Sequence, residues 1–149
     1  MHMLHHLSLP VTEIARSDRF YSATLSALGY VRVWAHEDGV GYGSPGGGDK
    51  FAIKLSRVPV VPPGPGFHIA FAAASREVVA NFHAAGIENG GKDSGPAGLH
   101  PHYGENCYAA FVIDPDEYQV EAVINTAVQL IERRNSRTES HVISSRPTP

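Results

Sequence analysis

The chain has 149 residues, a formal net charge of −3 at pH 7, nine histidines and one cysteine. This length fits one domain with a sizeable core, and no stretch approaches the roughly 18 apolar residues of a membrane span. Interspersed charge disfavours nucleic-acid binding, a single cysteine excludes an intrachain disulfide, and the start lacks a secretory signal pattern, so we expect a cytoplasmic protein without nucleic-acid or membrane partners.

The first half of the chain predicts the order β-α-β-β-β. Residues 4–11 alternate between aliphatic and other side chains, as in a half-buried strand, which places His6 and Ser8 together on the less apolar face. Thr12 is the expected helix N-cap and Gly29 the expected stop, because apolar residues between them recur at helical spacing. The further strands are expected at residues 30–35, 40–43 and 49–55.

Residues 58–66 contain four prolines and two glycines, which predicts a linker. A strand at residues 67–72 follows, and then a helix that Ser75 caps and Gly86 ends. The remaining elements are expected to be a strand at 87–92, a loop over 94–105 and a hairpin over 106–123 that turns at Asp114-Pro115-Asp116-Glu117.

The second half repeats the first in register. His6 recurs 62 residues later as His68, and Phe20 recurs at the same distance as Phe82. We therefore predict an α+β fold of two βαβββ modules with one linker between them.

Module one is expected at about residues 4–57 and module two at about 67–124, within a single domain of residues 4–124. A second match, with an offset of 67, aligns Lys54 with Glu121 near the ends of the two modules. Residues 125–149 are expected to form a short helix and a polar, disordered tail.

Glu121 is the residue that most needs an explanation. It shares one face of its predicted strand with Gln119 and has apolar neighbours, where burying an unpaired carboxylate is costly. With His6 and His68 it would form a two-histidine, one-carboxylate site, which leaves coordination positions open on Fe(II), Mn(II), Ni(II) or Zn(II). The alternative is that both histidines are hydrogen-bonded structural residues and that Glu121 pairs with a cation.

Residues 6–11 (HLSLPV), 68–71 (HIAF) and 108–116 (YAAFVIDPD) followed by Glu121 resemble the vicinal oxygen chelate superfamily of glyoxalases, bleomycin-resistance proteins and extradiol dioxygenases. The resemblance covers about residues 4–124. It implies two curved half-barrels of mixed sheet around a central pocket, a small-molecule substrate and a homodimer. It also implies metal ligands on the first, fourth, fifth and eighth strands, among which His6, His68 and Glu121 match the first, third and fourth ligands.

Lys54 departs from this pattern, because it stands at the second ligand position and an ammonium group cannot bind a metal. Four roles remain open for it: an ion pair with Glu121, a contact to an anionic substrate, a base with a lowered pKa, or an ordinary strand lysine that reaches solvent. The substitution argues against glyoxalase I activity.

The walls of the pocket follow from strand alternation, which leaves either face of the strand after residue 106 open. The loop of residues 98–106 is either a gate or an ordinary surface connection. The expected pocket residues are Ser8, Ala70, Tyr108, Ala110, His102, Tyr103 and Gln119.

These observations favour a metal-dependent enzyme that chelates a small oxygen-bearing substrate, for an isomerase, lyase or oxygenase step in which Glu121 and Lys54 are the catalytic candidates. The second hypothesis is a metal-free protein that binds a small molecule, as resistance proteins do, with Lys54 paired to Glu121. The third is a structural or regulatory domain without a pocket.

Overall fold

Each half of the chain folds in the order β-α-β-β-β, as predicted, in a computed structural model that describes residues 2–127. Module one comprises β1 to β4, and module two comprises β5 to β8. The elements are β1 (Leu7–Val11), α1 (Ile14–Ala27), β2 (Val31–His36), β3 (Gly39–Gly43), β4 (Phe51–Leu55), β5 (Ile69–Ala72), α2 (Arg76–Glu88), β6 (Lys92–Leu99), the 3-10 helix η1 (Pro101–Tyr103), β7 (Cys107–Ile113) and β8 (Gln119–Asn125).

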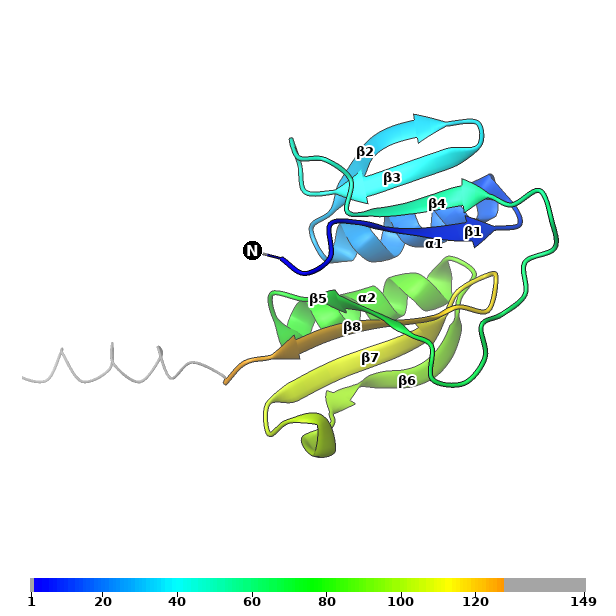
Figure 1. The fold of residues 1–149 in the computed structure, drawn as a ribbon. Helices are drawn as coiled ribbons and strands as arrows, with labels where there is room; N and C mark the ends of the chain where they lie inside the picture. Colours follow the sequence, from blue (N-terminus) through cyan, green and yellow to red (C-terminus); the bar gives the residue numbers. More distant parts are fainter. Residues whose placement is uncertain (1, 128–149) are drawn as a thin grey trace, which may run out of the picture.

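Each module contains one four-stranded mixed sheet, in the orders β1-β4-β3-β2 and β5-β8-β7-β6. β1 pairs in parallel with β4, and β5 pairs in parallel with β8, so both first strands lie at an edge of their sheet. Pro10 fits β1 because an edge strand tolerates a residue without an N–H group. Figure 1 shows the two sheets with β1 and β5 at their adjacent edges.

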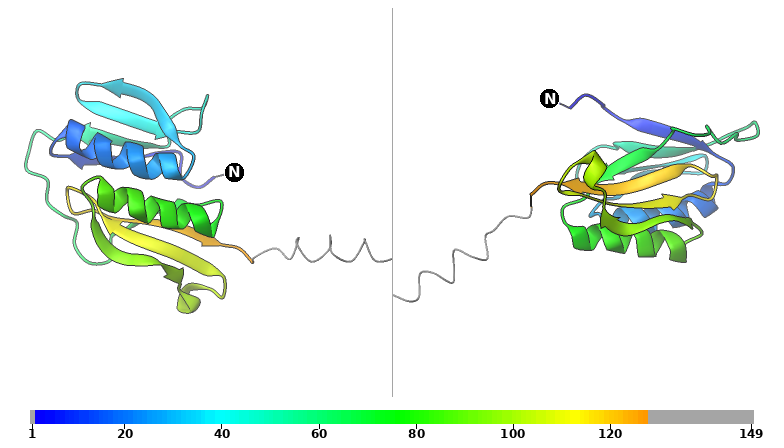
Figure 2. Two further views of the ribbon diagram at one scale, coloured as in Figure 1. Left: turned by 180° about the vertical axis from the view of Figure 1, so that it is seen from behind. Right: turned by 90° about the horizontal axis from the view of Figure 1, so that it is seen from below.

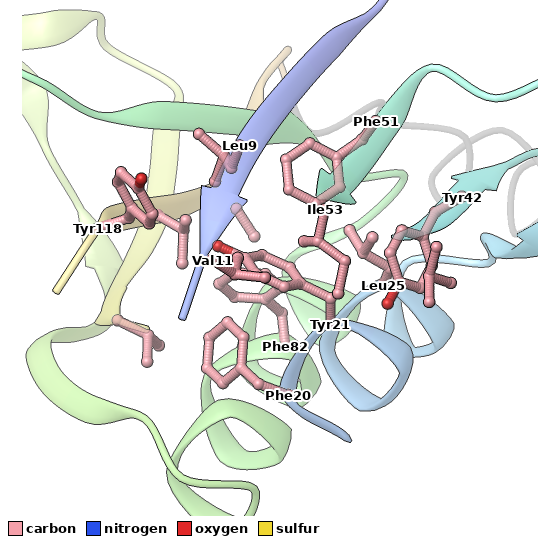
Figure 3. Packing of buried hydrophobic residues seen from close by; sticks show 14 of the residues in the cluster. Leu9, Val11, Phe20, Tyr21, Leu25, Tyr42, Phe51, Ile53, Phe82 and Tyr118 are labelled. Carbon is pink, nitrogen blue, oxygen red and sulfur yellow. The ribbon is translucent and has the colours of Figure 1, made fainter. Parts of the chain in front are cut away.

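Both helices cover the same side of the two sheets and pack against each other (Figure 2). We call the side of each sheet opposite the helices its open face. The core lies between helices and sheets, where Phe20, Tyr21 and Phe82 are fully buried with Val11 and Ile53 (Figure 3). This helix pairing joins the two modules through one continuous hydrophobic core.

The β7–β8 turn also ties module two to module one through the carboxylate of Asp116. This carboxylate accepts hydrogen bonds from the backbone N–H of Thr12 at 3.2 Å and from the hydroxyl of Ser17 at 3.2 Å. Arg16 adds an ion pair at 3.0 Å. Charge-assisted bonds of this kind fix the angle between the turn and the start of α1.

A second carboxylate of the same turn, Asp114, is buried. Its Oδ2 accepts a hydrogen bond from the hydroxyl of Tyr21 at 2.5 Å, and its Oδ1 accepts from the backbone N–H groups of Asp116 and Tyr118. Burial raises the pKa of Asp114, and the three donors act against that shift. The predicted turn is therefore confirmed, and both of its aspartates have structural partners.

Four element predictions were wrong. α2 continues past Gly86, its expected end, to Glu88, so residues 87 and 88 are helical where a strand was expected. A strand with irregular register, β6, begins at Lys92, where a loop was expected from residue 94. Glycine and proline in that stretch suggested a loop, but pairing with β7 holds it extended. The N-cap of α1 is Glu13, not Thr12, while Ser75 caps α2 as predicted. Most of the expected C-terminal helix and tail, residues 128–149, lies outside the described part.

Candidate functional site

A cleft of about 600 Å³ opens on the open face of module two, and we call it the module-two cleft. β5, β7 and β8 form its floor, and the proline-rich connection between the modules forms one wall. Phe67, Phe111 and Ile113 give it apolar surface, with Gln119 and Glu121 as polar groups. A largely apolar cleft of this size with a few convergent polar groups is typical of small-molecule sites.

Glu121 and His68 meet at the floor of this cleft. The Oε2 atom of Glu121 lies 3.5 Å from Nε2 of His68, and Glu121 is only 8% exposed. Burial raises the pKa of the Glu121 carboxyl, while His68 and His100 act to lower it. The predicted pairing of His68 with Glu121 is thus present in the fold, and this carboxylate can either exchange a proton or bind a cation.

Gln119 and Cys107 also line the cleft, and they differ in character. The side-chain oxygen of Gln119 accepts a hydrogen bond from the Ser94 hydroxyl at 3.1 Å, which leaves the amide N–H groups of Gln119 free to donate to a ligand. Burial and the nearby Glu121 raise the pKa of the Cys107 thiol, so this group stays protonated and acts as a small apolar wall.

The strand register corrects the alignment of Lys54 with Glu121. Ser8 lies opposite Ala52 in the β1–β4 ladder, just as Ala70 lies opposite Glu121 in the β5–β8 ladder. The structural equivalent of Glu121 is therefore Ala52, and Lys54 lies two residues further along β4 with its side chain exposed. The sequence match at an offset of 67 was off by two because both strands carry similar apolar patterns.

His6 does not join His68 and Glu121 within one chain. It precedes β1, its Nδ1 lies 2.8 Å from Nδ1 of His5, and it borders a different cleft. Within residues 2–127, no group of three or more His, Cys, Asp or Glu side chains is placed to hold a metal ion. At the floor of the module-two cleft, the described part of the chain therefore brings together an imidazole and a carboxylate, which is one ligand fewer than the predicted set.

The remaining predicted pocket residues divide into three groups. Ala70, Tyr103 and Gln119 border the module-two cleft. Tyr108 and Ala110 point to the opposite side, where Ala110 is part of the core and Tyr108 lies under the Arg76 guanidinium at 4.9 Å. Two others do not border this cleft: Ser8, which lies on β1, and the exposed His102, which packs on Tyr103 at 4.1 Å.

Phe111 and His100 are two of the residues at the site that sequence reasoning missed, and Phe67, Cys107 and Ile113 are others. Phe111 lies opposite Glu121 in the β7–β8 ladder, so the partner strand of Glu121 offered a signal for it. β7 is apolar on both faces, however, and its pattern does not define which face turns to the cleft. His100 packs edge-on against Phe111 at 5.3 Å and comes from a loop whose path no local pattern predicts.

Trp34 occupies the open face of module one. Its indole lies against Gly39 and Gly41, where a Cβ at Gly41 would collide with the indole nitrogen. The ring stacks with His36 at a centroid distance of 5.4 Å. The glycines of β3 thus make room for the one tryptophan of the chain.

Comparison with solved structures identifies the family. A glyoxalase/bleomycin resistance protein from Albidiferax ferrireducens is 34% identical, with 82% of this chain and 98% of that chain covered at a TM-score of 0.71. A glyoxalase-related enzyme from Fulvimarina pelagi shares the fold at 21% identity, with 84% and 89% covered and a TM-score of 0.65. A glyoxylase/bleomycin resistance protein/dioxygenase domain from a Frankia species does so at 17% identity, with 85% and 99% covered and a TM-score of 0.62.

The chain therefore belongs to the glyoxalase/bleomycin resistance protein family, and the predicted membership of the vicinal oxygen chelate superfamily is confirmed. No family model and no curated protein matches the sequence. Within residues 2–127, neither helix combines the length and apolar character needed to cross a membrane.

Proposed function

We propose that the protein is a metal-dependent enzyme for a small oxygen-bearing molecule, with each active site built from two copies of the chain. His68 and Glu121 of one copy would supply two ligands, and His6 of the second copy would supply the third. The observation that carries this proposal is the buried carboxylate of Glu121, which has the imidazole of His68 beside it at 3.5 Å.

The internal repeat supports a shared site. His6 occupies in module one the place that His68 occupies in module two, since each residue directly precedes the edge strand of its sheet. A twofold dimer that sets module one of each copy against module two of the other would bring His6 to the His68–Glu121 pair twice. We therefore propose a homodimer, which acts in the cytoplasm, where a lone buried thiol stays reduced.

Two imidazoles and one carboxylate suit Fe(II), Mn(II), Ni(II) or Zn(II), and such a metal supplies a Lewis acid that polarises substrate oxygens. The protein would position the substrate around it. Gln119 can donate to a substrate oxygen, and Phe111 and Tyr103 can enclose an apolar part. Isomerase, lyase and oxygenase reactions all fit this arrangement.

The second candidate is a metal-free binding protein of the resistance type. It is favoured by the raised pKa of Glu121, which allows that group to be buried without a metal, and by the apolar walls of the cleft. The proposed Lys54–Glu121 pair does not support it within one chain, because residues 2–127 contain no ion pair between these two side chains.

The test is metal content by elemental mass spectrometry on protein purified without chelator. We expect about one equivalent of metal per chain, and its loss in both His6→Ala and Glu121→Gln. Refolding an equal mixture of these two variants should restore about a quarter of an equivalent per chain, because half of the dimers then contain one intact shared site.

Two other results would contradict parts of this proposal. Metal that stays absent from the mixed variants but is present in the wild type would contradict the shared site. Wild-type protein that takes up none of the four metals would contradict the enzyme and leave the metal-free binding protein. Lys92→Ala, an exposed change outside the cleft, is the matched control and should keep full metal content.

A further inference from the structure

A second cleft of about 560 Å³ lies where the two modules meet, and we call it the junction cleft. The segment leading into β1 forms one side, β5 forms the other, and α1 with β3 and β4 closes it. Ala70 borders both clefts, whereas Glu121 and His68 border only the module-two cleft. The two clefts are therefore neighbours with separate polar groups.

The walls of the junction cleft are apolar and come from both modules. Phe51 of β4 and Phe71 of β5 meet edge to face at 5.3 Å, and Leu25 of α1 is almost fully buried beside them. Tyr42 contributes its ring, because its hydroxyl is turned to Asp18 at 2.7 Å. The volume lies in the range of roughly 300 to 1,000 Å³ that is usual for small organic ligands.

Among the described residues, Lys50 is the one lysine, arginine, aspartate or glutamate that lines this cleft. Lys50 carries a positive charge, His5 and His6 offer imidazole nitrogens, and no Asp or Glu is among its lining residues. Asp18, which meets Tyr42, is already paired with Arg32 at 3.0 Å. The cleft therefore combines an apolar body with a cationic rim.

The module-two cleft has the opposite character. Glu117 and Glu121 border it, and none of its lining residues is a lysine or an arginine. In the metal-free protein, a carboxylate-bearing ligand would thus be repelled from the module-two cleft and attracted to the junction cleft, because its charge is like that of Glu117 and Glu121 and opposite to that of Lys50.

We propose that the junction cleft is a binding site for an amphipathic monocarboxylate, such as a medium-chain fatty acid. The hydrocarbon chain would lie along Phe51 and Phe71, and the carboxylate would pair with the ammonium group of Lys50. His6, the proposed third metal ligand, also borders this cleft. Lys50, which would pair with the carboxylate, belongs to neither the His68–Glu121 pair nor the third ligand position.

The experiment is isothermal titration calorimetry of the full chain with octanoate, octanol and octylamine. We expect octanoate to bind once per chain, about threefold more tightly than octanol, with no detectable binding of octylamine, because one ion pair with an exposed lysine accounts for a factor of that order. Equal binding of all three compounds, or no binding of octanoate, would overturn the inference.

Two variants place the ligand. Lys50→Glu should weaken octanoate binding by about tenfold or more, whereas Lys92→Glu, the same charge change at an exposed position outside both clefts, should not. Ala72→Trp, on the exposed edge of β5, should block the cleft by filling it. Equal affinities for Lys50→Glu and Lys92→Glu would refute the site.

Glu121→Gln separates this inference from the proposed function. We expect this variant to keep octanoate binding, whatever its metal content. If Glu121→Gln abolishes octanoate binding while Lys50→Glu leaves it intact, the ligand occupies the module-two cleft and the junction site is wrong, even where the metal result supports a shared enzyme site.

Discussion

Removing the hydroxyl of Tyr21 tests whether the β7–β8 turn is held by a charge-assisted hydrogen bond. Tyr21 is fully buried and donates to Asp114 at 2.5 Å, and Asp114 is itself only 3% exposed. Tyr21→Phe leaves one carboxylate oxygen without a donor in a place that water barely reaches. Losing a hydrogen bond to a charged group costs about 1.5 to 3 kcal/mol of unfolding free energy.

Tyr118→Phe is the matched control for this variant. The Tyr118 hydroxyl donates to a neutral acceptor, the backbone carbonyl of Pro10, at 2.8 Å. Losing such a bond costs about 0.5 to 1.5 kcal/mol, so Tyr21→Phe should be about twice as destabilising as Tyr118→Phe at pH 7. Urea unfolding followed by circular dichroism measures both losses of unfolding free energy. The slope of the unfolding free energy against urea concentration should be the same in both variants and the wild type.

The pH dependence of this stability loss is a second test of the hydrogen bond between Tyr21 and Asp114. The Tyr21 hydrogen bond favours the ionised Asp114, whose pKa burial otherwise raises above 3.8. The stability difference between wild type and Tyr21→Phe should therefore be full above the folded-state pKa of Asp114 and shrink as the pH falls through it. A cost no larger than that of Tyr118→Phe, and equal at pH 7 and at acid pH, would refute a charge-assisted bond.

Three further predictions concern a close contact, a strained residue and the site carboxylate. Gly41→Ala should displace the indole of Trp34, lower the stability by about 1 to 3 kcal/mol and shift the tryptophan emission to longer wavelength. Glu117 has a φ of 70°, so Glu117→Gly should stabilise the protein by about 0.5 to 1 kcal/mol in urea unfolding. Glu121→Gln should stabilise the metal-free protein by about 1 kcal/mol at pH 7 in the same assay. The gain should vanish below pH 4.5, because the raised pKa of Glu121 makes the folded wild-type protein less stable only as the pH rises above 4.5.

The controls use residues of the same type in ordinary surroundings. Gly48→Ala has open space around its Cβ and should change stability by less than about 0.5 kcal/mol. Glu105→Gly lacks the positive φ of Glu117 and should destabilise slightly. An unchanged tryptophan spectrum in Gly41→Ala, a loss of stability in Glu117→Gly, or a pH-independent gain in Glu121→Gln would contradict the respective argument.

Much of the fold follows from local patterns in the sequence. Strand patterns predict every strand except β6, helical spacing predicts α1 and α2, and Ser75 caps the second helix as expected. The register between His6 and His68 predicts the twofold repeat, and the Asp-Pro-Asp turn predicts the last hairpin. These signals act over a few residues, so they hold whatever surrounds them.

The candidate site is only partly readable in the same way. Alternation within one strand places Glu121 and Gln119 together, and the repeat places His68 beside them. The sequence does not show which face of β7 borders the cleft, because the side chains of β7 are apolar on both faces. The pairing of β7 within its sheet places Phe111, and not Ala110, at the cleft.

The sequence by itself determined most of the elements, how they repeat and that Glu121 has apolar neighbours along its strand. The tertiary structure alone decided that β4 pairs so that Ala52, not Lys54, corresponds to Glu121, and that His6 lies away from the His68–Glu121 pair. The physical reason is that the relative placement of two modules depends on helix packing and on the contacts of Asp116 with α1 and its approach, which join residues about a hundred positions apart and leave no local pattern.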